Sequence, residues 1–367
     1  MPKRKTIRNL TIALGIAACT ITACLTAPTT SWAQEPPPHH VASLQFLHPI
    51  ATSPDPETST SFRLSLLYGR SGRVKGLDLN AVAGVTSGDV TGLALSGLLN
   101  RVGGGFGGIA GTLGVNNMAG GSAGWQVAGL ANWNQDAFTG VQMASVLNYT
   151  DRGFAGAQIS GVMNLNDRAG TFAQVSSVAN VNAGPFAGVQ VSAFLNAANS
   201  TASGGQLALL NFAEDMSGVQ VGLFNMGRRF HGLKIGLVNT GYEITGTTIG
   251  LVNRDLDSRK EWMFYASNIS LGNIGYRTVL NHWSSVVSMG YGDAQGDIDQ
   301  TLFFAWNFGR NIPLNDKWDL TIDLGFQHII PKSSDDPAEN DRLQYALQAR
   351  ALGEYRLNDG LGPVSYT

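Results

Sequence analysis

A short internal repeat is the feature that most constrains how this chain can fold. Segments such as GVQMASVLN (Gly140–Asn148) and GAQISGVMN (Gly156–Asn164) recur, and shorter forms such as GVQVGLFN (Gly218–Asn225) follow them. The final asparagines lie at positions 100, 116, 132, 148, 164, 180, 196, 211, 225, 239 and 253, so the spacing is 16 six times, then 15, then 14 three times. Self-similarity at a fixed period indicates a repeat architecture in which each unit packs on its neighbours.

Side-chain character alternates along each repeat with a period of two. In the Gly140 unit, aliphatic residues alternate with small or amide-bearing ones, namely Val141, Met143 and Leu147 against Gly140, Gln142, Ala144 and Asn148. Between residues 102 and 213 the chain has only five charged residues, and all five fall in the turn clusters between units. A period of two, with β-branched residues and glycine, predicts strands rather than helices.

The composition excludes several classes of protein. Charged residues make up 14% of the 367 residues, whereas a soluble domain usually has ~25%. The formal net charge of −2 gives no basis for nucleic-acid binding, so no nucleic-acid partner is expected. The hydrophobic fraction of 43% excludes an intrinsically disordered chain.

The units resemble those of a leptospiral-type bacterial surface-repeat family, in which G-x-Q-x-[GA]-x-x-N units follow a signal peptide. The resemblance extends from residue 62 to the carboxyl end, and Gly218–Asn225 matches the motif in full. It implies a location at the cell surface or outer membrane of a Gram-negative bacterium. It implies no activity, so it supplies no catalytic, cofactor-binding or metal-binding residue.

Residues 1–33 have the pattern of a secretory signal peptide. Its parts are a basic start (Lys3, Arg4, Lys5 and Arg8), an uncharged apolar run (Leu10–Leu25) and a small-x-small cleavage site (Ser31, Trp32 and Ala33). Both cysteines, Cys19 and Cys24, lie inside this segment, so cleavage after Ala33 leaves a mature chain without cysteine. Ile21–Cys24 also resembles a lipobox, which makes lipidation at Cys24 the alternative. Either route predicts export.

Three further segments follow the signal peptide. Residues 34–61 are Pro-rich and predict a linker, residues 62–257 hold the repeats, and residues 258–367 predict amphipathic β-strands. In the linker, His39 and His40 could bind a metal ion. No further ligand lies at a useful spacing, so we expect a solvated pair instead.

Alternation continues in the carboxyl-terminal region. Leu320, Ile322, Leu324 and Phe326 oppose Thr321, Asp323, Gly325 and Gln327. Alternating segments of about ten residues, flanked by aromatic residues, are typical of outer-membrane β-barrels. A soluble antiparallel sandwich with one wet face is the alternative for this region.

Two all-β architectures fit the whole chain. The one we favour is an outer-membrane-type antiparallel β-barrel of about 20 short strands that includes the repeats, with its aliphatic face in lipid and its Gln/Asn face lining the lumen. The alternative is a β-solenoid of 14–16-residue coils followed by an antiparallel carboxyl-terminal sheet. In a solenoid, Gln and Asn stack in columns at ~4.8 Å, and a corner is needed inside the longer strand, for example at Gly140.

Two clusters resemble nucleotide or catalytic motifs. Gly103–Gly108 matches G-x-G-x-x-G, but a dinucleotide site needs a following helix, and this run falls in a repeat turn. Residues Asn281, His282 and Ser284 are adjacent in sequence, but a hydrolytic triad is assembled in space rather than along the chain. We therefore predict no catalytic residue and no cofactor.

Two charged clusters are expected to be structural as well. The acidic residues Asp335, Asp336, Glu339 and Asp341 lack the spacing of a Ca²⁺ loop. Arg228 and Arg229 could contact a lipid headgroup, but a plain turn explains them. Lys234 is a rare charge on the repeat faces, whereas selective pores commonly use rings of charge.

These patterns predict an exported outer-membrane or cell-surface β-protein with a structural or surface-interaction role, without catalysis, and with a passive pore as a further option. The alternative is a surface-attached β-solenoid adhesin, soluble or lipidated rather than embedded. A hydrolase that uses His282 is a third hypothesis. The expected partners are the lipid bilayer of the outer membrane and an unidentified surface ligand.

Overall fold

The computed structural model describes residues 38–255, 258–267, 270–292, 301–330, 345–355 and 364–366. These residues form strands and turns in two sheets, one of 25 strands and one of seven. The predicted signal peptide, including Cys19 and Cys24, lies outside the described residues. The acidic residues Asp335, Asp336, Glu339 and Asp341 lie outside them too.

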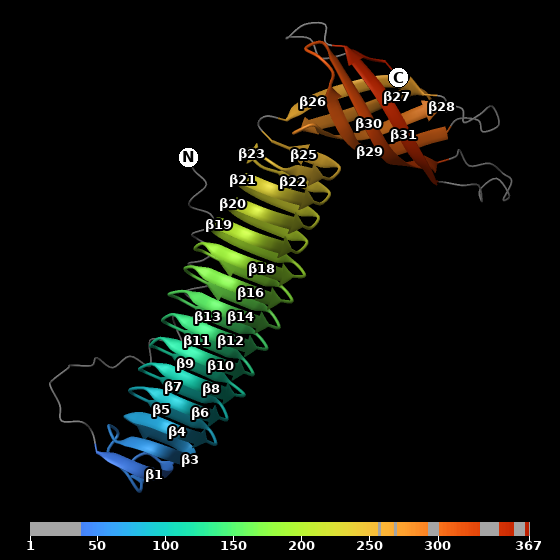
Figure 1. Cartoon of the computed structure of the whole chain (residues 1–367). Helices are drawn as coiled ribbons and strands as arrows, with labels where there is room; N and C mark the ends of the chain where they lie inside the picture. Colours follow the sequence, from blue (N-terminus) through green and yellow to red (C-terminus); the bar gives the residue numbers. More distant parts are fainter. Residues whose placement is uncertain are drawn as a thin grey trace, which may run out of the picture. The chain divides into compact units, whose positions relative to one another are not determined.

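The repeats form a parallel β-solenoid of about 14 turns (Figure 1). Its strands are β1 (His39–Leu47), β2 (Ile50–Ala51), β3 (Ser59–Ser71), β4 (Arg73–Asn80), β5 (Ala83–Thr86), β6 (Val90–Ser96), β7 (Leu99–Val102), β8 (Phe106–Thr112), β9 (Val115–Met118), β10 (Ser122–Ala128), β11 (Ala131–Asn134), β12 (Phe138–Ala144), β13 (Leu147–Thr150), β14 (Phe154–Ser160), β15 (Met163–Asn166), β16 (Gly170–Ser176), β17 (Ala179–Asn182), β18 (Phe186–Ser192), β19 (Leu195–Leu207), β20 (Leu210–Val221), β21 (Phe224–Ile235), β22 (Val238–Thr240), β23 (Glu243–Ile244), β24 (Thr247–Ile249) and β25 (Val252–Arg254).

Each central coil contains one seven-residue and one four-residue strand, such as β12 and β13, separated by a two-residue bend. The coils stack in register, so that Gln142 lies opposite Gln126 and Gln158 in parallel strands. Asn148 lies opposite Asn132 and Asn164 in the same way. Neighbours in an up-and-down barrel run antiparallel. The favoured barrel is therefore wrong for the repeats, and the solenoid alternative is confirmed.

The corner that a solenoid coil requires lies at a glycine inside the longer strand. Gly140 has a φ of 131°, and equivalent glycines along the stack share this conformation. A Cβ on Gly140 would lie 2.0 Å from the carbonyl oxygen of Gly124 in the preceding coil. Only glycine meets both demands without strain, since it tolerates positive φ and close backbone approach. Phe172 is the exception, because it occupies this position with a φ of 95° and is 70% exposed.

An unbroken ladder of asparagines runs through the interior from Asn100 to Asn253. Asn148 Nδ2 donates to Asn164 Oδ1 over 2.9 Å and also to the Ile159 carbonyl over 2.8 Å. Its Oδ1 accepts from Asn132 Nδ2 over 2.9 Å. A buried amide is costly unless it is hydrogen-bonded, and the stack pairs each one with the next coil. This explains why the asparagine persists while the repeat shortens from 16 to 14 residues.

A second ladder is built from glutamines. Gln158 Nε2 donates to Gln142 Oε1 over 2.8 Å, and the pattern continues from Gln126 to Gln220. These bonds point toward the amino-terminal coils, whereas the asparagine bonds point toward the carboxyl-terminal coils. The predicted amide columns are therefore confirmed. A column of buried phenylalanines, including Phe138 and Phe154, completes the interior beside them.

Charged side chains occupy the glutamine column near its two ends. At the amino-terminal end, Arg63 is 1% exposed and pairs with Asp78, with Nε to Oδ1 at 2.7 Å and Nη2 to Oδ2 at 2.6 Å. At the carboxyl-terminal end, Lys234 lies opposite Gln220 in the register. The segment predicted as a linker contributes to this stack, since β1 begins at His39 and pairs in parallel with β3. The solenoid thus begins earlier than residue 62.

The seven-stranded sheet is antiparallel, and each strand pairs with the next along the chain. Its strands are β26 (Arg259–Ser267), β27 (Ser270–Leu280), β28 (Trp283–Gly292), β29 (Thr301–Pro313), β30 (Trp318–Ile330), β31 (Tyr345–Tyr355) and β32 (Val364–Tyr366). The predicted alternation is present, with its polar side buried: Asp323 is 1% exposed and Leu324 is 70% exposed. Arg350 makes two 2.9 Å hydrogen bonds to the Asp323 carboxylate.

Hydrogen bonds join this sheet to the last coils of the solenoid. Asn281 Nδ2 donates to the Ile244 carbonyl over 2.6 Å, and Ser285 Oγ donates to the Gly250 carbonyl over 2.5 Å. In the part of the chain that the structure describes, no helix is long and apolar enough to cross a membrane.

Candidate functional site

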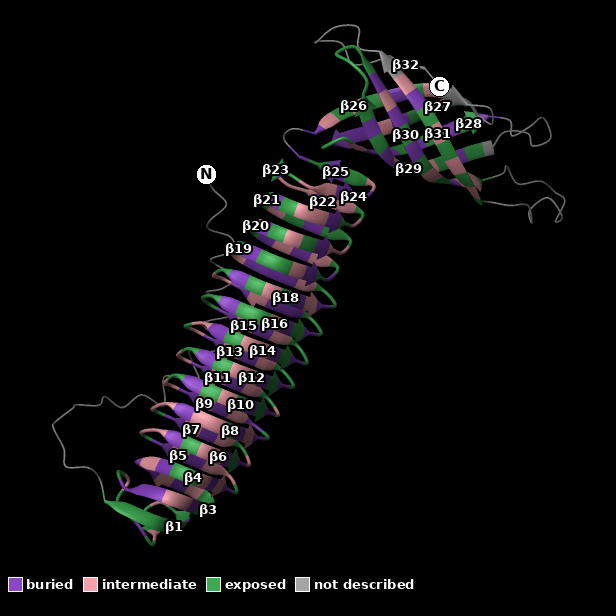
Figure 2. Ribbon diagram, viewed as in Figure 1, coloured by how far each residue is buried: buried purple, intermediate pink, exposed green. Residues whose placement is uncertain are grey.

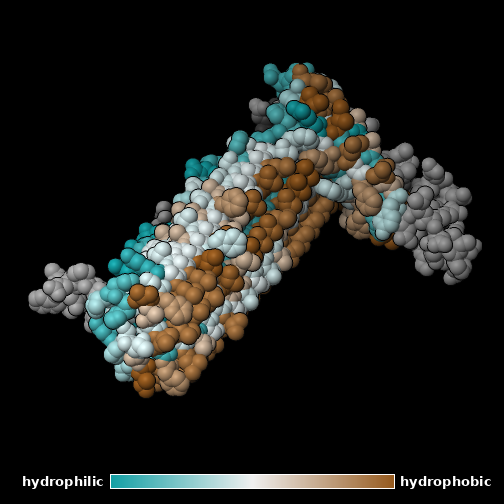
Figure 3. All heavy atoms as spheres, turned by 60° about the horizontal axis from the view of Figure 1, so that its bottom comes forward, coloured by the Kyte–Doolittle hydropathy of each residue, from teal (hydrophilic) through white to brown (hydrophobic). Residues whose placement is uncertain are grey.

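The outer surface of the solenoid carries a long apolar band. Its crest is the row of residues just before the second strand of each coil, and it comprises Leu98, Leu130, Val146, Val162, Val178, Phe194, Leu209, Leu223 and Leu237, with Gly114 at this position in one coil. All nine of these side chains are exposed, from 37% for Val162 to 61% for Leu98. Exposed residues recur from coil to coil along the ribbon in Figure 2, and Figure 3 shows hydrophobic side chains running along the stack.

The band continues on both sides of the crest. In one coil, Met143 of β12 lies on one flank and Leu147 of β13 lies on the other, and both side chains point outward. The outward positions equivalent to Val141, Met143 and Leu147 are aliphatic, aromatic, Gly, Ala or Thr from Leu93 to Val252, without a charged residue, whereas Arg101 lies one outward position further along β7. Burial of the amide face forces the aliphatic face outward, because successive side chains of a strand point to opposite sides.

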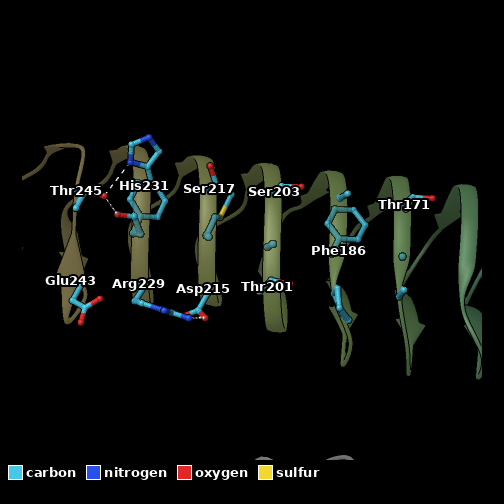
Figure 4. A pocket seen from close by; sticks show the side chains of 17 residues that line it. Thr171, Phe186, Thr201, Ser203, Asp215, Ser217, Arg229, His231, Glu243 and Thr245 are labelled. Atoms are coloured by element: carbon cyan, nitrogen blue, oxygen red, sulfur yellow. Dashed lines mark hydrogen bonds and ion pairs between the residues drawn. The ribbon is translucent and has the colours of Figure 1, made fainter.

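A groove of about 590 Å³ lies half a coil away from this crest (Figure 4). Its floor includes Phe186, Met216 and Phe230, which are buried at the start of their coils. Two rows of side chains border it. One row contains Thr171, Ser203, Ser217, His231 and Thr245, and the other contains Thr201, Asp215, Arg229 and Glu243. The groove crosses successive coils, so an extended ligand would meet one side chain of each row at each step.

Ion pairs organise the charged row. Arg229 binds the Asp215 carboxylate through Nε, with a distance of 3.0 Å to Oδ1, and through Nη2. Arg228 adds a 3.0 Å contact from Nη2 to Asp215 and a 3.6 Å contact from Nε to Glu214. The hydrogen bond from Arg229 lowers the pKa of Asp215 below its usual range. Arg228 and Arg229, which were expected in a turn, thus lie in β21 and pair with acidic side chains of β20.

His231 is the one aromatic base in the polar row of the groove. Its Nδ1 lies 3.0 Å from Thr245 Oγ1 in the next coil. Both side chains are aligned with the serine hydroxyls of the preceding coils in Figure 4. The arrangement offers hydrogen-bonding groups to a bound polar chain.

Lys234 lies inside the solenoid rather than on a face. It is 0% exposed, its Nζ donates to the Thr240 carbonyl over 2.9 Å, and Nζ lies 4.5 Å from the centroid of the Phe230 ring. Burial lowers the pKa of Lys234 to about 8, and the negative charge of Asp255 partly opposes this shift. The Oε1 of Gln220, the preceding residue of the column, has no hydrogen-bond partner.

The predicted histidine pair lies in β1. His39 hydrogen-bonds with Ser59 Oγ at 3.3 Å through Nδ1 and with Ser61 Oγ at 3.1 Å through Nε2, and His40 is exposed. Among the described residues, no group of three His, Cys, Asp or Glu side chains could hold a metal ion. The two histidines contribute to the first coil of the solenoid.

The G-x-G-x-x-G match of Gly103–Gly108 lies at a repeat turn and the strand that follows it. Gly103–Gly105 form the turn between β7 and β8, and Phe106 begins the strand β8. Gly105 N donates to Asp89 Oδ1 over 2.9 Å. A strand follows the glycines instead of the helix that a dinucleotide site requires.

The Asn281–Ser284 cluster is a hairpin turn between β27 and β28. Asn281 and His282 have φ values of 49° and 67°, the conformation of a two-residue turn with both central residues left-handed. Ser284 is 0% exposed, and its Oγ has no hydrogen-bond partner. A nucleophilic serine needs a base within hydrogen-bond reach, so this cluster does not form a serine–histidine pair.

Sequence reasoning missed the groove and did not recognise the band as one surface. Two recurring sequence features could have indicated the groove. Thr or Ser recurs two residues after many of the turns, and charged residues such as Asp215, Arg229 and Glu243 lie just before the start of the later coils. Both surfaces arise only when residues 14–16 apart stack, so they required the solenoid to be known first.

The sequence matches no protein-family model. No curated protein and no solved structure is significantly similar to the chain.

Proposed function

We propose that the protein is an exported, adhesin-like β-solenoid that acts at the outer membrane or cell surface as a surface-interaction scaffold, without catalysis. The observation that carries this proposal is the stack of near-identical coils, which repeats one set of outward side chains many times. Solenoids use such extended lateral surfaces for binding. The predicted signal peptide of residues 1–33 supports export, as does the surface-repeat resemblance.

The groove is the proposed contact for a surface ligand. Its apolar floor and two polar rows suit an extended chain with alternating apolar and hydrogen-bonding groups. Arg229 and Glu243 give it charges of both signs. The ligand class is therefore an extended peptide or glycan of mixed polarity.

The carboxyl-terminal sheet is the proposed contact with the lipid bilayer. Phe264, Leu324 and Leu347 are 73%, 70% and 91% exposed on its outer side, whereas ion-paired groups such as Asp323 are buried. An apolar exterior over a polar interior is the arrangement favoured by lipid surroundings.

The proposal is tested by producing the full chain with an epitope in the exposed turn at Arg152 and measuring its access to antibody and protease on intact bacterial cells. We expect the epitope to be accessible and the chain to fractionate with the outer membrane. A matched chain without residues 1–33 should remain inside the cell. Retention of the full chain inside the cell would overturn the proposal.

Membrane contact is tested separately with Leu324→Glu combined with Leu347→Glu. The matched control is Thr139→Glu combined with Thr171→Glu on the solenoid. We expect carbonate to extract the first variant and to leave the second in the membrane fraction. Equal extraction of both would show that the sheet is not the contact.

A further inference from the structure

The apolar band has chemistry suited to an apolar medium rather than to a hydrogen-bonded partner. Its crest extends over ten coils, which at ~4.8 Å per strand corresponds to roughly 45 Å. Its crest and the outward positions equivalent to Val141, Met143 and Leu147 carry no charge and almost no hydrogen-bonding groups. Monomeric soluble proteins rarely expose a continuous apolar surface of this extent, and larger ones mark protein or membrane contacts.

The shape of the band distinguishes between these two kinds of contact. The crest residue Val146 lies at the bend between β12 and β13, so Met143 and Leu147 belong to flanks that face different directions. A band folded around a corner is convex. A second rigid and convex surface, such as the same band on a second copy of the chain, can contact only the crest or one flank. A fluid of acyl chains covers both.

The distribution of polar and aromatic groups agrees with a lipid surface. Asp215, Arg229 and Glu243 lie half a coil away from the crest and would remain in water. Trp125 and Phe194 are 54% and 51% exposed on the band. The indole ring of Trp125, which has a polar N–H group, favours the boundary between water and hydrocarbon, whereas the ring of Phe194 favours the hydrocarbon itself.

We infer that the apolar band sinks into the acyl boundary of a lipid bilayer, so that the solenoid lies along the membrane with its groove facing water. The inference rests on the proposed surface role and adds a second membrane contact to that of the carboxyl-terminal sheet. Interfacial elements of this kind bury their apolar face by about 5–10 Å. Because the band has no charge, its binding is independent of anionic lipid and of salt.

The test compares two variants of the full chain that carry the same added charge in the same three coils. The crest variant combines Val146→Glu, Val162→Glu and Val178→Glu. The control variant combines Thr139→Glu, Ala155→Glu and Thr171→Glu, which are exposed on the groove side. None of the six contributes to the amide ladders. Circular dichroism and thermal melting should therefore show both variants folded like the parent.

Binding is measured by co-sedimentation with phosphatidylcholine vesicles at low and high salt. We expect the parent and the control variant to bind equally at both salt concentrations. The crest variant should partition about tenfold less, because glutamates placed at the acyl boundary pay a transfer cost. Equal partitioning of the two variants, or none by the parent, would overturn the inference.

A site-resolved measurement separates the band from the carboxyl-terminal sheet. In a background with Cys19→Ser and Cys24→Ser, an environment-sensitive fluorophore is attached at Val162→Cys or, as the control, at Ala155→Cys. Vesicles should shift only the Val162 label to the blue, and lipid-borne quenchers should quench only that label. A Val162 label that stays in water while the protein binds would refute the inference.

Light scattering without lipid tests whether a second copy of the chain, rather than lipid, covers the apolar band. A dimer that the crest variant abolishes, together with no response of the Val162 label to vesicles, would show that a second copy covers the band. These assays use purified protein, whereas the proposed function is tested on intact cells. Either test can give a negative result while the other is positive, so failure of this inference and failure of the proposed function are distinguishable.

Discussion

Asn148 Nδ2 donates a 2.9 Å hydrogen bond to Asn164 Oδ1 of the next coil, and the glutamine bond beside it points the opposite way along the stack. Aligned amides add their dipoles, so two ladders of opposite direction reduce the net dipole of the interior. The two amide ladders of the interior are therefore directionally balanced, and they lie beside buried apolar side chains such as Phe138 and Phe154. The aliphatic side chains at the outward strand positions lie on the outer surface instead.

Loss of one ladder amide should destabilise the solenoid far more than loss of its outward neighbour. Asn116 is 0% exposed and bonds to Asn100, Asn132 and the Val127 carbonyl, whereas Asn117 points outward. Asn116→Ala leaves buried partners unsatisfied, at about 1–3 kcal/mol per group. We expect Asn116→Ala to lower the free energy of unfolding by about 3 kcal/mol or more and Asn117→Ala by less than about 0.5 kcal/mol. Urea denaturation measures both, and equal effects would contradict the ladder account.

Stability should rise with pH above about 8 because of Lys234. Its pKa is about 8 in the folded chain, against an ordinary lysine pKa of 10.5. Between these pH values the unfolded chain binds more protons, so the free energy of unfolding increases with pH. Below about pH 8 the folded chain bears the full cost of the buried charge, roughly 3 kcal/mol from the difference between the two pKa values.

Lys234→Gln should remove this pH dependence and stabilise the chain at neutral pH. The new amide would continue the glutamine column and supply a donor to Oε1 of Gln220. Lys75→Gln, at an exposed position, is the control and should leave the profile unchanged. Chemical denaturation from pH 7 to about pH 10.5 provides the measurement. A Lys234→Gln profile that still rises as steeply as the parent would refute the assignment.

Relief of backbone strain at Phe172 should stabilise the solenoid. A non-glycine residue at positive φ costs about 1–3 kcal/mol, and replacing it by glycine removes that cost. The greater conformational entropy of glycine in the unfolded chain offsets about 0.5–1 kcal/mol of this stabilisation. We expect Phe172→Gly to raise the free energy of unfolding by about 1 kcal/mol. The reverse test is Gly156→Ala, whose Cβ would lie 2.0 Å from the Gly140 carbonyl oxygen. That variant should unfold at a lower urea concentration than the parent, and a neutral result would contradict the corner.

Removal of one whole coil should be tolerated, whereas removal of half a coil should not. Deleting residues 138–153 brings β10 onto β14 with Gln126 opposite Gln158 and Asn132 opposite Asn164, so both ladders close again. Deleting residues 138–145 moves glutamines out of their column. Circular dichroism should show a folded chain for the first deletion and loss of cooperative melting for the second. If both deletions melt alike, coil register does not determine stability.

The strands and their columns were predictable from residues such as Gln142 and Asn148, because period-two alternation and a fixed spacing are local properties of the sequence. The corner was predictable from Gly140 for the same reason. The choice between barrel and solenoid was not, because alternation is the same in parallel and antiparallel strands. The direction of neighbouring strands depends on how each turn returns the chain, which no single repeat specifies.

The candidate surfaces were less predictable than the fold. Val146 and Val162 are 16 residues apart and become neighbours only after stacking, so the band is a property of the assembled coils. Asp215 and Arg229 looked like unrelated turn charges, but the 14-residue spacing places them in contact. The start of the solenoid was obscured by prolines that occupy the loops around β1 and β2.

The charged residues near the two ends of the glutamine column bear on how the protein avoids polymerisation. An amide column that ran to the ends would present a template to other chains, as cross-β fibres do. Here Arg63 and Asp78 occupy the column on one side, beyond Ala94 and Ala110, and Lys234 occupies it on the other. Arg63 and Lys234 can donate hydrogen bonds but cannot accept them, so neither can serve as a rung of an amide ladder, and the glutamine column cannot be continued through them at either end.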